Sequence, residues 1–221
     1  MSIGDRSRAG MLSLLLSGRA CTGVELARAV GIARSTASEH LARLVDAKLV
    51  VVQPAGRHRY YALASPAVAE ALERLGALAP VQNVTSLRQA NVGDALRHAR
   101  SCYDHLAGRL SVALADSLQR ENAIIAREGS FEVTEVGITR LYEIGIDVDG
   151  LRSSRRAFAR PCLDWSERRH HVAGAVGAAL LARFIELDWL QRQVSSRALR
   201  ITPAGRAGFK ERWDISDDPD L

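Results

Sequence analysis

The chain contains few cysteines and few aromatic residues. Its 221 residues include three cysteines, and aromatic residues make up 5% of the total. An odd and sparse cysteine count argues against a disulfide framework and favours a reducing cytoplasm. Because aromatic rings are scarce, the core must be built mostly from Leu, Val, Ala and Ile, which favours packed helices over a β-sandwich.

Long hydrophobic runs are also missing. The longest run near the start, residues 11–16, is too short for a signal peptide or a membrane span. We therefore expect a cytoplasmic protein that does not associate with a membrane. The hydrophobic content of 47% is still enough for a substantial core, and the length suits one or two domains.

The net charge of +5 is unevenly distributed along the chain. Residues 1–80 carry 10 basic and 6 acidic side chains, a net +4, whereas residues 81–221 carry 20 and 19, a net +1. A local positive field attracts a polyanion such as DNA, although the same excess could serve only solubility.

The first third of the chain has the pattern of a helix-turn-helix followed by a hairpin. Helices are predicted at residues 5–17, 24–30, 33–47 and 66–78, and strands at 49–53 and 58–63 around a turn at 54–56. Thr22 and Glu25 form a capping box for the second helix, and Gly31 permits the sharp turn after it. This arrangement predicts a winged helix-turn-helix.

Hydrogen-bonding side chains occupy the outward face of the predicted third helix and the tip of the hairpin. Short polar groups near a helix N-terminus suit base edges, and basic groups at a wing suit phosphates. The alternative is a helical bundle with a polar face. The predicted DNA-binding residues are Arg34, Ser35, Thr36, Ser38, Glu39, His40, Arg57, His58 and Arg59.

Two segments resemble the ArsR/SmtB family of bacterial repressors. They are ELARAVGIARSTASEHLARLVDAKLV at 25–50 and GRHRYYAL at 56–63, within a resemblance that covers about residues 5–79. The resemblance implies a homodimer whose dimer face comes from residues 5–17 and 66–78. It also implies an autoregulating repressor that an inducer releases from a double-stranded DNA operator.

The chain departs from the sensor motifs of that family. Leu26, Ala27 and Arg28 stand where arsenic sensors carry a Cys-x-Cys pair. Residues 66–78 contain neither the His nor the Asp that zinc sensors carry on the last helix. Any sensor must therefore lie in residues 81–221, which the resemblance does not cover.

The rest of the chain contains an internal repeat. Residues 99–104 match 159–164, residues 105–114 match 171–180, and residues 131–137 match 199–205, with 165–170 as an insertion in the second copy. A long helix is predicted at 92–118. The domains are therefore a DNA-binding domain (1–79), a linker (80–90) and a duplicated sensor or oligomerisation region (91–221), with repeats at about 91–150 and 155–213.

The repeat pairs thiols with imidazoles. It makes Cys102 equivalent to Cys162 and His105 equivalent to His171, and the predicted long helix puts His98, Cys102 and His105 on one face. Convergence of the two copies would make a Cys₂His₂ site for zinc or another soft transition metal. His98 and His170 are possible extra ligands. The alternative is that both cysteines are plain core residues.

Other features of the second part leave further readings open. Arg155, Arg156, Arg160, Arg168 and Arg169 surround Cys162, where they could lower a thiolate pKa or simply form a solvated face. The tryptophans, Trp165, Trp189 and Trp213, could line an organic-ligand pocket or cap the core.

The predicted fold is mainly α with small β-hairpins: a winged helix-turn-helix followed by a repeated, winged-helix-like region. The predicted function is a non-enzymatic, dimeric transcriptional repressor that is released by a metal ion or a thiol-reactive signal. One alternative is the same DNA-binding role with a small organic ligand. An enzyme that uses Cys102 or Cys162 as nucleophile is disfavoured, because no phosphate loop, nucleophile elbow or acid pair is present. A purely architectural protein is a third possibility.

Overall fold

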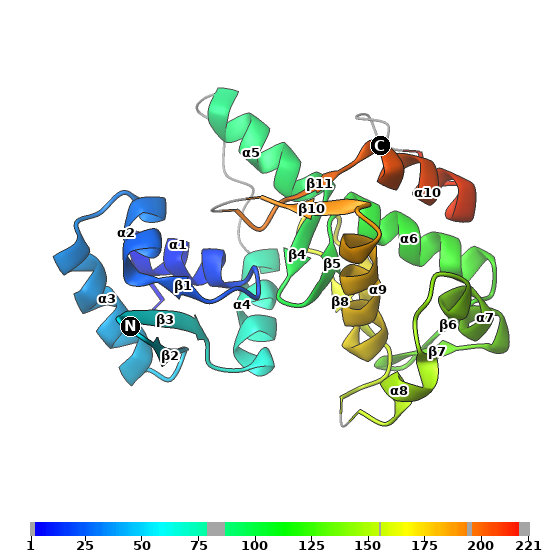
Figure 1. Cartoon of the computed structure of the whole chain (residues 1–221), viewed down its shortest axis with the longest axis horizontal. Coiled ribbons are helices and arrows are strands. Elements are labelled where there is room, and N and C mark those ends of the chain that lie inside the picture. Colours follow the sequence, from blue (N-terminus) through cyan, green and yellow to red (C-terminus); the bar gives the residue numbers. More distant parts are fainter. Residues whose placement is uncertain (1–2, 79–86, 155, 194–195, 217–221) are drawn as a thin grey trace.

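The structure is a computed structural model that describes residues 3–78, 87–154, 156–193 and 196–216. Figure 1 shows the N-terminal part, residues 3–78, at one end of the molecule and the later elements at the other. The elements of the N-terminal part are α1 (Arg6–Leu15), β1 (Cys21–Thr22), α2 (Gly23–Val30), α3 (Arg34–Asp46), β2 (Val50–Ala55), β3 (His58–Leu63) and α4 (Pro66–Leu78).

Local signals in the sequence define the helix-turn-helix. The Thr22 side chain accepts from the Glu25 backbone N–H while the Glu25 carboxylate accepts from the Thr22 N–H, so the predicted capping box starts α2. Gly31 ends α2 in the left-handed conformation at φ 71°. The buried face of α3 consists of Ala37, Leu41 and Leu44, which pack into the N-terminal core.

The hairpin of the N-terminal part turns later than the sequence suggested. β2 and β3 are paired as far as Ala55 and His58, so the turn is Gly56 and Arg57 and not residues 54–56. Pro54 lies inside β2, which is tolerated because β2 is an edge strand in the order β1-β3-β2. Gly56 has a φ of 58°, as a tight two-residue turn requires.

The second part begins with a helix that starts inside the predicted linker. α5 runs from Leu87 to His98, and the remainder of the linker, residues 80–86, lies outside the described residues. The elements that follow α5 are β4 (Arg100–Cys102), β5 (His105–Ala107), α6 (Arg109–Arg120), β6 (Ile124–Arg127), β7 (Ser130–Val133), α7 (Glu135–Glu143), α8 (Val148–Arg152), β8 (Arg160–Leu163), β9 (His170–Ala173), α9 (Gly174–Glu186), β10 (Leu190–Arg192), β11 (Leu199–Ile201) and α10 (Pro203–Trp213).

The predicted long helix at 92–118 is wrong. The chain leaves α5 at His98, forms the β4–β5 hairpin and enters α6 only after Gly108. Gly108 has a φ of 93°, and a Cβ there would lie 2.7 Å from the carbonyl oxygen of Arg97. An α-helix cannot pass through such a residue, so the hairpin interrupts it.

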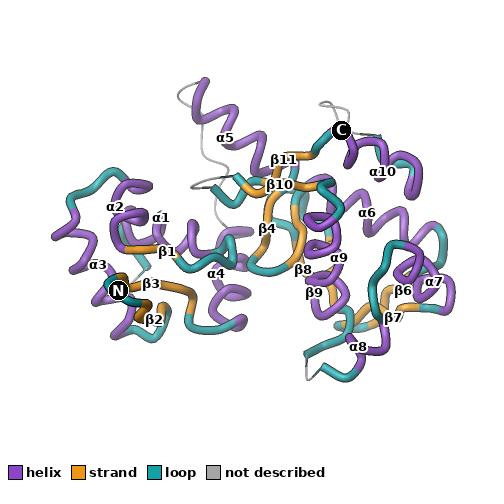
Figure 2. The backbone as a smooth tube through the Cα atoms, in the orientation of Figure 1, coloured by secondary structure: helices purple, strands orange, loops and turns teal. Residues whose placement is uncertain are grey.

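The repeat is present in three dimensions, and each copy is a hairpin, a helix, a second hairpin and a second helix. The first copy runs from β4 to α7 and the second from β8 to α10, with α8 between them. α6 packs against β9 and α9 packs against β5, so each copy's long helix contacts the other copy's first hairpin. This reciprocal packing is what a pseudo-two-fold relation between the two copies requires, and Figure 2 shows β4, β8 and α9 together at the centre of the repeat region.

The two parts have separate hydrophobic cores. One core joins α1, α2, α3 and the β2–β3 hairpin, and the other joins both copies of the repeat. Trp189 and Trp213 lie in the second core, stacked on or edge-on to Phe184, which supports the core interpretation of these tryptophans. Among the described residues, no helix is long and apolar enough to cross a membrane.

Candidate functional site: a helix-turn-helix and a buried Cys/His cluster

The exposed face of α3 presents the predicted DNA-reading side chains. Because its opposite face is fixed in the core, the first two turns of α3 expose a basic residue, three hydroxyls and a carboxylate. The Ser38 hydroxyl donates a hydrogen bond to the Arg34 carbonyl oxygen at 3.0 Å. The exposed residues are Arg34, Ser35, Thr36, Ser38 and Glu39.

His40 does not share this face, contrary to expectation. Its side chain is 15% exposed, and Nδ1 lies 3.1 Å from Nη1 of Arg8. Nε2 lies 3.8 Å from Oδ1 of Asp5, the residue that caps α1. His40 lies one turn after Thr36 on α3. Its ring contacts Arg8 of α1, so the side chain connects α3 to α1 and does not point outward.

The hairpin tip carries the predicted wing residues. Arg57, His58 and Arg59 are all exposed at the end of β2 and β3. The tip projects three groups that can donate hydrogen bonds to phosphate oxygens. Its exposure and charge are those that a DNA-contacting wing needs.

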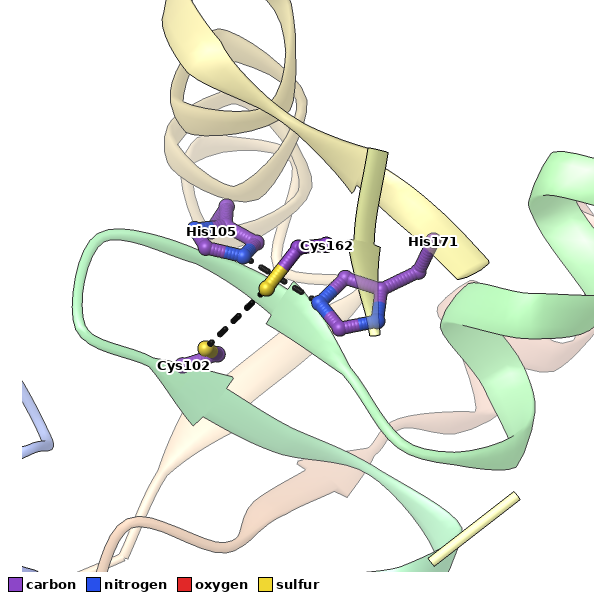
Figure 3. A group of neighbouring side chains, drawn as sticks. All are labelled: Cys102, His105, Cys162 and His171. Atoms are coloured by element: carbon purple, nitrogen blue, oxygen red, sulfur yellow. Dashed lines mark hydrogen bonds between the residues drawn. The ribbon is translucent and has the colours of Figure 1, made fainter. Parts of the chain in front are cut away.

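Four side chains from the two copies of the repeat converge, as the repeat predicted. Cys102 and His105 are cross-strand neighbours on the β4–β5 hairpin, and Cys162 and His171 are cross-strand neighbours on the β8–β9 hairpin. Figure 3 shows the four pointing toward one another from these hairpins. All four are buried, and one ligating atom of each lies within 4.8 Å of the others. We call this group the Cys/His cluster.

The spacing of the cluster suits a tetrahedral metal ion. The two Sγ atoms are 4.0 Å apart and the two Nε2 atoms are 3.1 Å apart. Zinc bonds of about 2.3 Å to sulfur and about 2.0 Å to nitrogen put tetrahedral sulfurs about 3.8 Å apart and nitrogens about 3.3 Å apart. The S–S and N–N separations are close to these values, and all four ligating atoms lie within 4.8 Å of one another, so a small inward movement of the side chains would complete the coordination.

A carboxylate stands behind each imidazole. Nδ1 of His105 lies 3.1 Å from Oδ1 of Asp104, and Nδ1 of His171 lies 3.6 Å from Oδ2 of Asp164. The hydrogen bond to Asp104 makes Nδ1 the protonated nitrogen of His105 and turns its Nε2 toward the cluster, whereas Nδ1 of His171 has no hydrogen-bond partner among the described residues and only lies near the Asp164 charge. The two Nε2 atoms then face each other, which requires a proton or a metal cation between them.

Sequence reasoning assigned no role to Asp104, although a signal for it was present. Asp104 and Asp164 occupy equivalent positions of the repeat, two residues after each cysteine. The repeat therefore duplicates three groups, a thiol, an imidazole and a carboxylate, and not only the two that sequence reasoning paired.

The two sulfurs differ in protonation. Hydrogen bonds with Cys102, His105 and His171 hold the pKa of Cys162 far below its ordinary value, although burial opposes them. The hydrogen bond to Cys162 and burial raise the pKa of Cys102 well above its ordinary value. Cys162 is thus the thiolate that accepts a hydrogen bond from the Cys102 thiol. A thiolate is the form that binds metal ions.

The two histidines also differ. Burial lowers the pKa of His105, but hydrogen bonds to Asp104 and Cys162 outweigh it, so the net shift is upward. Burial lowers the pKa of His171, and the positive charge of His105 adds to this effect. The cluster therefore holds a proton on the His105 side, a proton that a metal ion would displace.

A fully buried ion pair fixes the second copy's carboxylate. Nη2 of Arg100 donates to Oδ2 of Asp164 at 2.9 Å, and both side chains are 0% exposed. Burial raises the pKa of Asp164, but the charge of Arg100 and hydrogen bonds from Ser166 and the Gly108 N–H outweigh it and lower the pKa strongly. Arg100 also lies over the Trp165 ring at 4.5 Å. Asp164 is therefore a permanent anion beside His171.

The β4–β5 turn joins the Cys/His cluster to the N-terminal part. Tyr103, which lies directly after Cys102, donates its backbone N–H to the Leu16 carbonyl at the end of α1, at 2.8 Å. Its ring packs against the N-terminal core, and it adopts a φ of 61°. A Cβ at Gly18 would overlap the Tyr103 carbonyl oxygen, so the two backbones are in direct contact. Tyr103, the neighbour of Cys102, thus connects the Cys/His cluster to the N-terminal part.

The remaining predicted ligands lie elsewhere. His98 ends α5, and His170 is exposed at the start of β9, so neither belongs to the Cys/His cluster. The shared helix face predicted for His98, Cys102 and His105 does not exist, because β4 and β5 replace that part of the helix. Cys21 lies on β1 in the N-terminal part, away from the cluster.

The comparisons with known proteins agree with the helix-turn-helix. Residues 3–53 match a family model described as a helix-turn-helix domain. The uncharacterized HTH-type transcriptional regulator YdfF of Bacillus subtilis is 43% identical over 213 residues, which cover 96% of this chain and 94% of YdfF.

Two solved structures match a little over a third of this chain. Reduced HlyU from Vibrio cholerae is 27% identical, with a TM-score of 0.32, over 35% of this chain and 80% of HlyU. The cadmium metal-sensor CMTR from Mycobacterium tuberculosis is 33% identical, with a TM-score of 0.32, over 38% of this chain and 88% of CMTR. The motif that sequence and structure define, together with a relative that matches nearly end to end, identifies the chain as a member of the helix-turn-helix transcriptional regulators, with a DNA-binding region of the ArsR/SmtB type.

Proposed function

We propose that the chain is a cytoplasmic, dimeric repressor whose operator binding is relieved when a soft transition metal ion, zinc in the first instance, binds the Cys/His cluster. Residues 1–79 would form the DNA-binding domain and residues 91–221 the sensor region. The observation that carries the proposal is the convergence of two thiols and two imidazoles within 4.8 Å.

The donor set selects the class of metal. Two sulfur and two nitrogen donors in tetrahedral spacing favour zinc and other soft or borderline ions over magnesium or calcium, which prefer oxygen. The carboxylate of Asp104 orients the His105 imidazole, and the carboxylate of Asp164 adds negative charge beside His171. Trivalent arsenic is a poorer candidate, because it favours three thiolates and Cys21 lies away from the cluster.

The β4–β5 turn offers a route from the metal to DNA. A bound ion would fix Cys102 and His105, the residues that flank the turn at Tyr103 and Asp104. Tyr103 touches the end of α1, and α1 packs against α2 and α3 of the helix-turn-helix. A movement of the turn would therefore move α1 and, through α1, the helix α3. Such a connection is what linkage between metal binding and DNA binding requires.

The dimer component is supported by exposed apolar side chains on α4. Leu75 is 52% exposed and Leu78 is 81% exposed. We expect Leu75→Glu combined with Leu78→Glu to produce monomers in sedimentation equilibrium. Val136, an exposed apolar residue on α7, supplies the control Val136→Glu, which should leave the dimer intact. A double variant that stays dimeric would place the dimer interface elsewhere.

The metal proposal is tested by cobalt and zinc binding. The full chain should bind one Co²⁺ per protomer, with intense visible absorption from tetrahedral coordination and a thiolate charge-transfer band in the near ultraviolet. Zinc should displace it. Cys162→Ser should lose both signals, and Cys21→Ser, which removes the cysteine outside the cluster, should keep them.

The same variants connect metal binding to DNA. Fluorescence anisotropy with duplex DNA from upstream of the chain's own gene should show zinc-dependent release for the wild type and for Cys21→Ser. Cys162→Ser should bind the DNA as tightly but resist release. Zinc release that survives in Cys162→Ser would contradict the proposal.

A thiol-reactive signal is the second candidate, because the Sγ atoms of Cys102 and Cys162 are only 4.0 Å apart. Hydrogen peroxide can oxidise the pair: the Cys162 thiolate and the Cys102 thiol together lose one proton and two electrons, one S–S bond forms, and the peroxide takes up that proton, a second proton from water and the two electrons to become two water molecules. Mass spectrometry after peroxide treatment should then find a Cys102–Cys162 disulfide in the metal-free chain. Absence of this disulfide at full Cys162 oxidation would contradict this candidate.

A further inference from the structure

A cleft of about 590 Å³ lies where the N-terminal part meets the repeat region. Its walls come from the start of α4, the β4–β5 turn, the segment before β8, the exposed side of α9 and the end of β10. The volume lies within the range of small-molecule sites, and such sites occur preferentially between structural units.

One side of the cleft is apolar. α9 contributes the small side chains Ala178 and Ala182 and the methyl groups of Leu181, and α4 contributes Pro66 and Ala67 on the opposite side. The small residues on both helices leave room for a ligand body, and Leu181, 1% exposed, closes the floor of the apolar side. A hydrocarbon group of a few carbon atoms would be removed from water here.

The rim of the cleft has an excess of positive charge. Arg156 pairs with Asp104 at 2.7 Å, and Arg160 pairs with Glu70 at 3.5 Å. Arg192 is the third arginine, and within the described residues its recorded contact is with a neutral group, the Ser17 carbonyl, at 3.3 Å. Three guanidinium groups and two carboxylates leave one positive charge without a carboxylate.

The surroundings of Arg192 do not neutralise its charge. Desolvation by neighbouring groups, together with the nearby positive charge of Arg19, lowers the pKa of Arg192, although the residue stays exposed to solvent. An anion in the cleft would offset the repulsion between Arg192 and Arg19. A guanidinium group offers paired donors that match a carboxylate in a bidentate arrangement.

A second, much smaller cavity lies beside the cleft. It is lined by Cys102, His105 and Cys162 of the Cys/His cluster and shares Tyr103 and Asp104 with the cleft. Asp104 holds Arg156 with one oxygen and His105 with the other. An anion that engages Arg156 would therefore act on a carboxylate that orients a cluster histidine.

We propose that this cleft binds a small organic monocarboxylate with a short aliphatic body, its carboxylate held by Arg192 and Arg156 and its hydrocarbon against α9. Such a ligand touches α4 of the N-terminal part and α9 of the second copy at once. It would thus report a metabolite of this chemical class to the DNA-reading part.

Calorimetry on the metal-free full chain tests the proposal with acetate, butanoate, hexanoate and the neutral analogue hexanamide. Hexanoate should bind at least tenfold more tightly than acetate, because each buried methylene contributes up to about 0.8 kcal/mol. Hexanamide should bind at least tenfold more weakly than hexanoate. No binding of hexanoate, or equal binding of hexanoate and hexanamide, overturns the proposal.

Three variants locate the site. Arg192→Gln should weaken hexanoate binding at least tenfold, and Ala182→Trp, at an exposed position of α9, should abolish it by filling the cleft. Arg200→Gln, on the neighbouring strand β11 and outside the cleft lining, should bind hexanoate as the wild type does. Unchanged affinity in both Arg192→Gln and Ala182→Trp overturns the assignment, whatever the metal experiments show.

Discussion

The two copies of the repeat supply the same three chemical groups to the Cys/His cluster but hold them differently. In the first copy a two-residue turn joins Cys102 to His105, and that turn contacts α1. In the second copy the six extra residues 165–170 lengthen the hairpin and fold back over Arg100 and Asp164. Duplication thus produced one copy that is anchored inside the repeat region and one that touches the DNA-reading part.

The equivalent arginines of the two copies offer the largest test of this difference. Arg100 is fully buried against Asp164, whereas Arg160 is 28% exposed and pairs with Glu70 of α4. Arg100→Met should lower the free energy of unfolding by about 3–5 kcal/mol, because it leaves a buried carboxylate uncompensated. Arg160→Met should cost less than about 1 kcal/mol. Urea unfolding measures both, and equal losses would mean that the copies are anchored alike.

The carboxylates behind the two histidines sharpen the comparison. Asp104→Asn should weaken zinc binding by about ten- to hundredfold, since it removes the hydrogen-bond partner that orients His105, whereas Asp164→Asn should weaken it less, since it removes only a nearby negative charge from His171. Only Asp164→Asn should also lower stability, because it leaves Arg100 without its counter-ion. Competition with a chromophoric chelator gives the affinities. If zinc affinity were unchanged in Asp104→Asn, the metal would depend on the residues of the second copy.

The contact between the first copy and α1 can be broken with a glycine pair. Gly18 and Gly31 have φ values of 73° and 71°, so alanine at either site carries a backbone cost of about 1–2 kcal/mol. A Cβ at Gly18 meets the Tyr103 carbonyl, whereas a Cβ at Gly31 meets nothing within 4 Å. Gly18→Ala should therefore reduce zinc-dependent release of DNA while leaving zinc affinity unchanged, and Gly31→Ala should alter neither. The same behaviour in both variants would show that the contact carries no signal.

The prediction with the smallest expected effect tests whether a hairpin of the repeat also contacts DNA, as the N-terminal hairpin is expected to do. Replacing Arg57 and Arg59 with Ala should make the salt dependence of DNA binding shallower by about 2 in log–log slope, at about 0.9 per phosphate contact. Arg127→Ala, at the exposed tip of the β6–β7 hairpin, should leave the slope unchanged. A shallower slope for Arg127→Ala would make the first copy a second DNA-binding surface.

The sequence predicted the N-terminal part well because its signals are local. The capping box at Thr22, the left-handed Gly31 and the inward face of α3 each depend on neighbours within one or two turns. His40 was misplaced because helix periodicity alone does not show that α1 crosses α3 at that point.

The Cys/His cluster was predicted from equivalence and not from periodicity. The repeat placed Cys102 opposite Cys162 correctly even though the helix assigned around Cys102 was wrong. Strands of three residues are too short to show an alternating pattern, so β4 and β5 left no such signal. Pro161, which the second copy carries at the position of Ser101, was the available warning against a helix.

The contacts between the two parts were beyond sequence reasoning. Two features depend on how the N-terminal core packs against the core of the repeat region: the contact of Tyr103 with the end of α1, and the cleft beside Arg192. No spacing within either part encodes that arrangement. These contacts are therefore where a structure adds most to the functional argument.

The placement of the ligands on two hairpins makes the cluster a removable cross-link. Cys102 and Cys162 are 60 positions apart in the chain, so an ion shared between them closes a loop of that length. By the chain-entropy argument used for disulfides, closing such a loop restricts the unfolded chain by about 4 kcal/mol. The loaded chain should consequently resist proteases across the whole segment between the hairpins, so that metal supply would set the lifetime of the regulator as well as its occupancy on DNA.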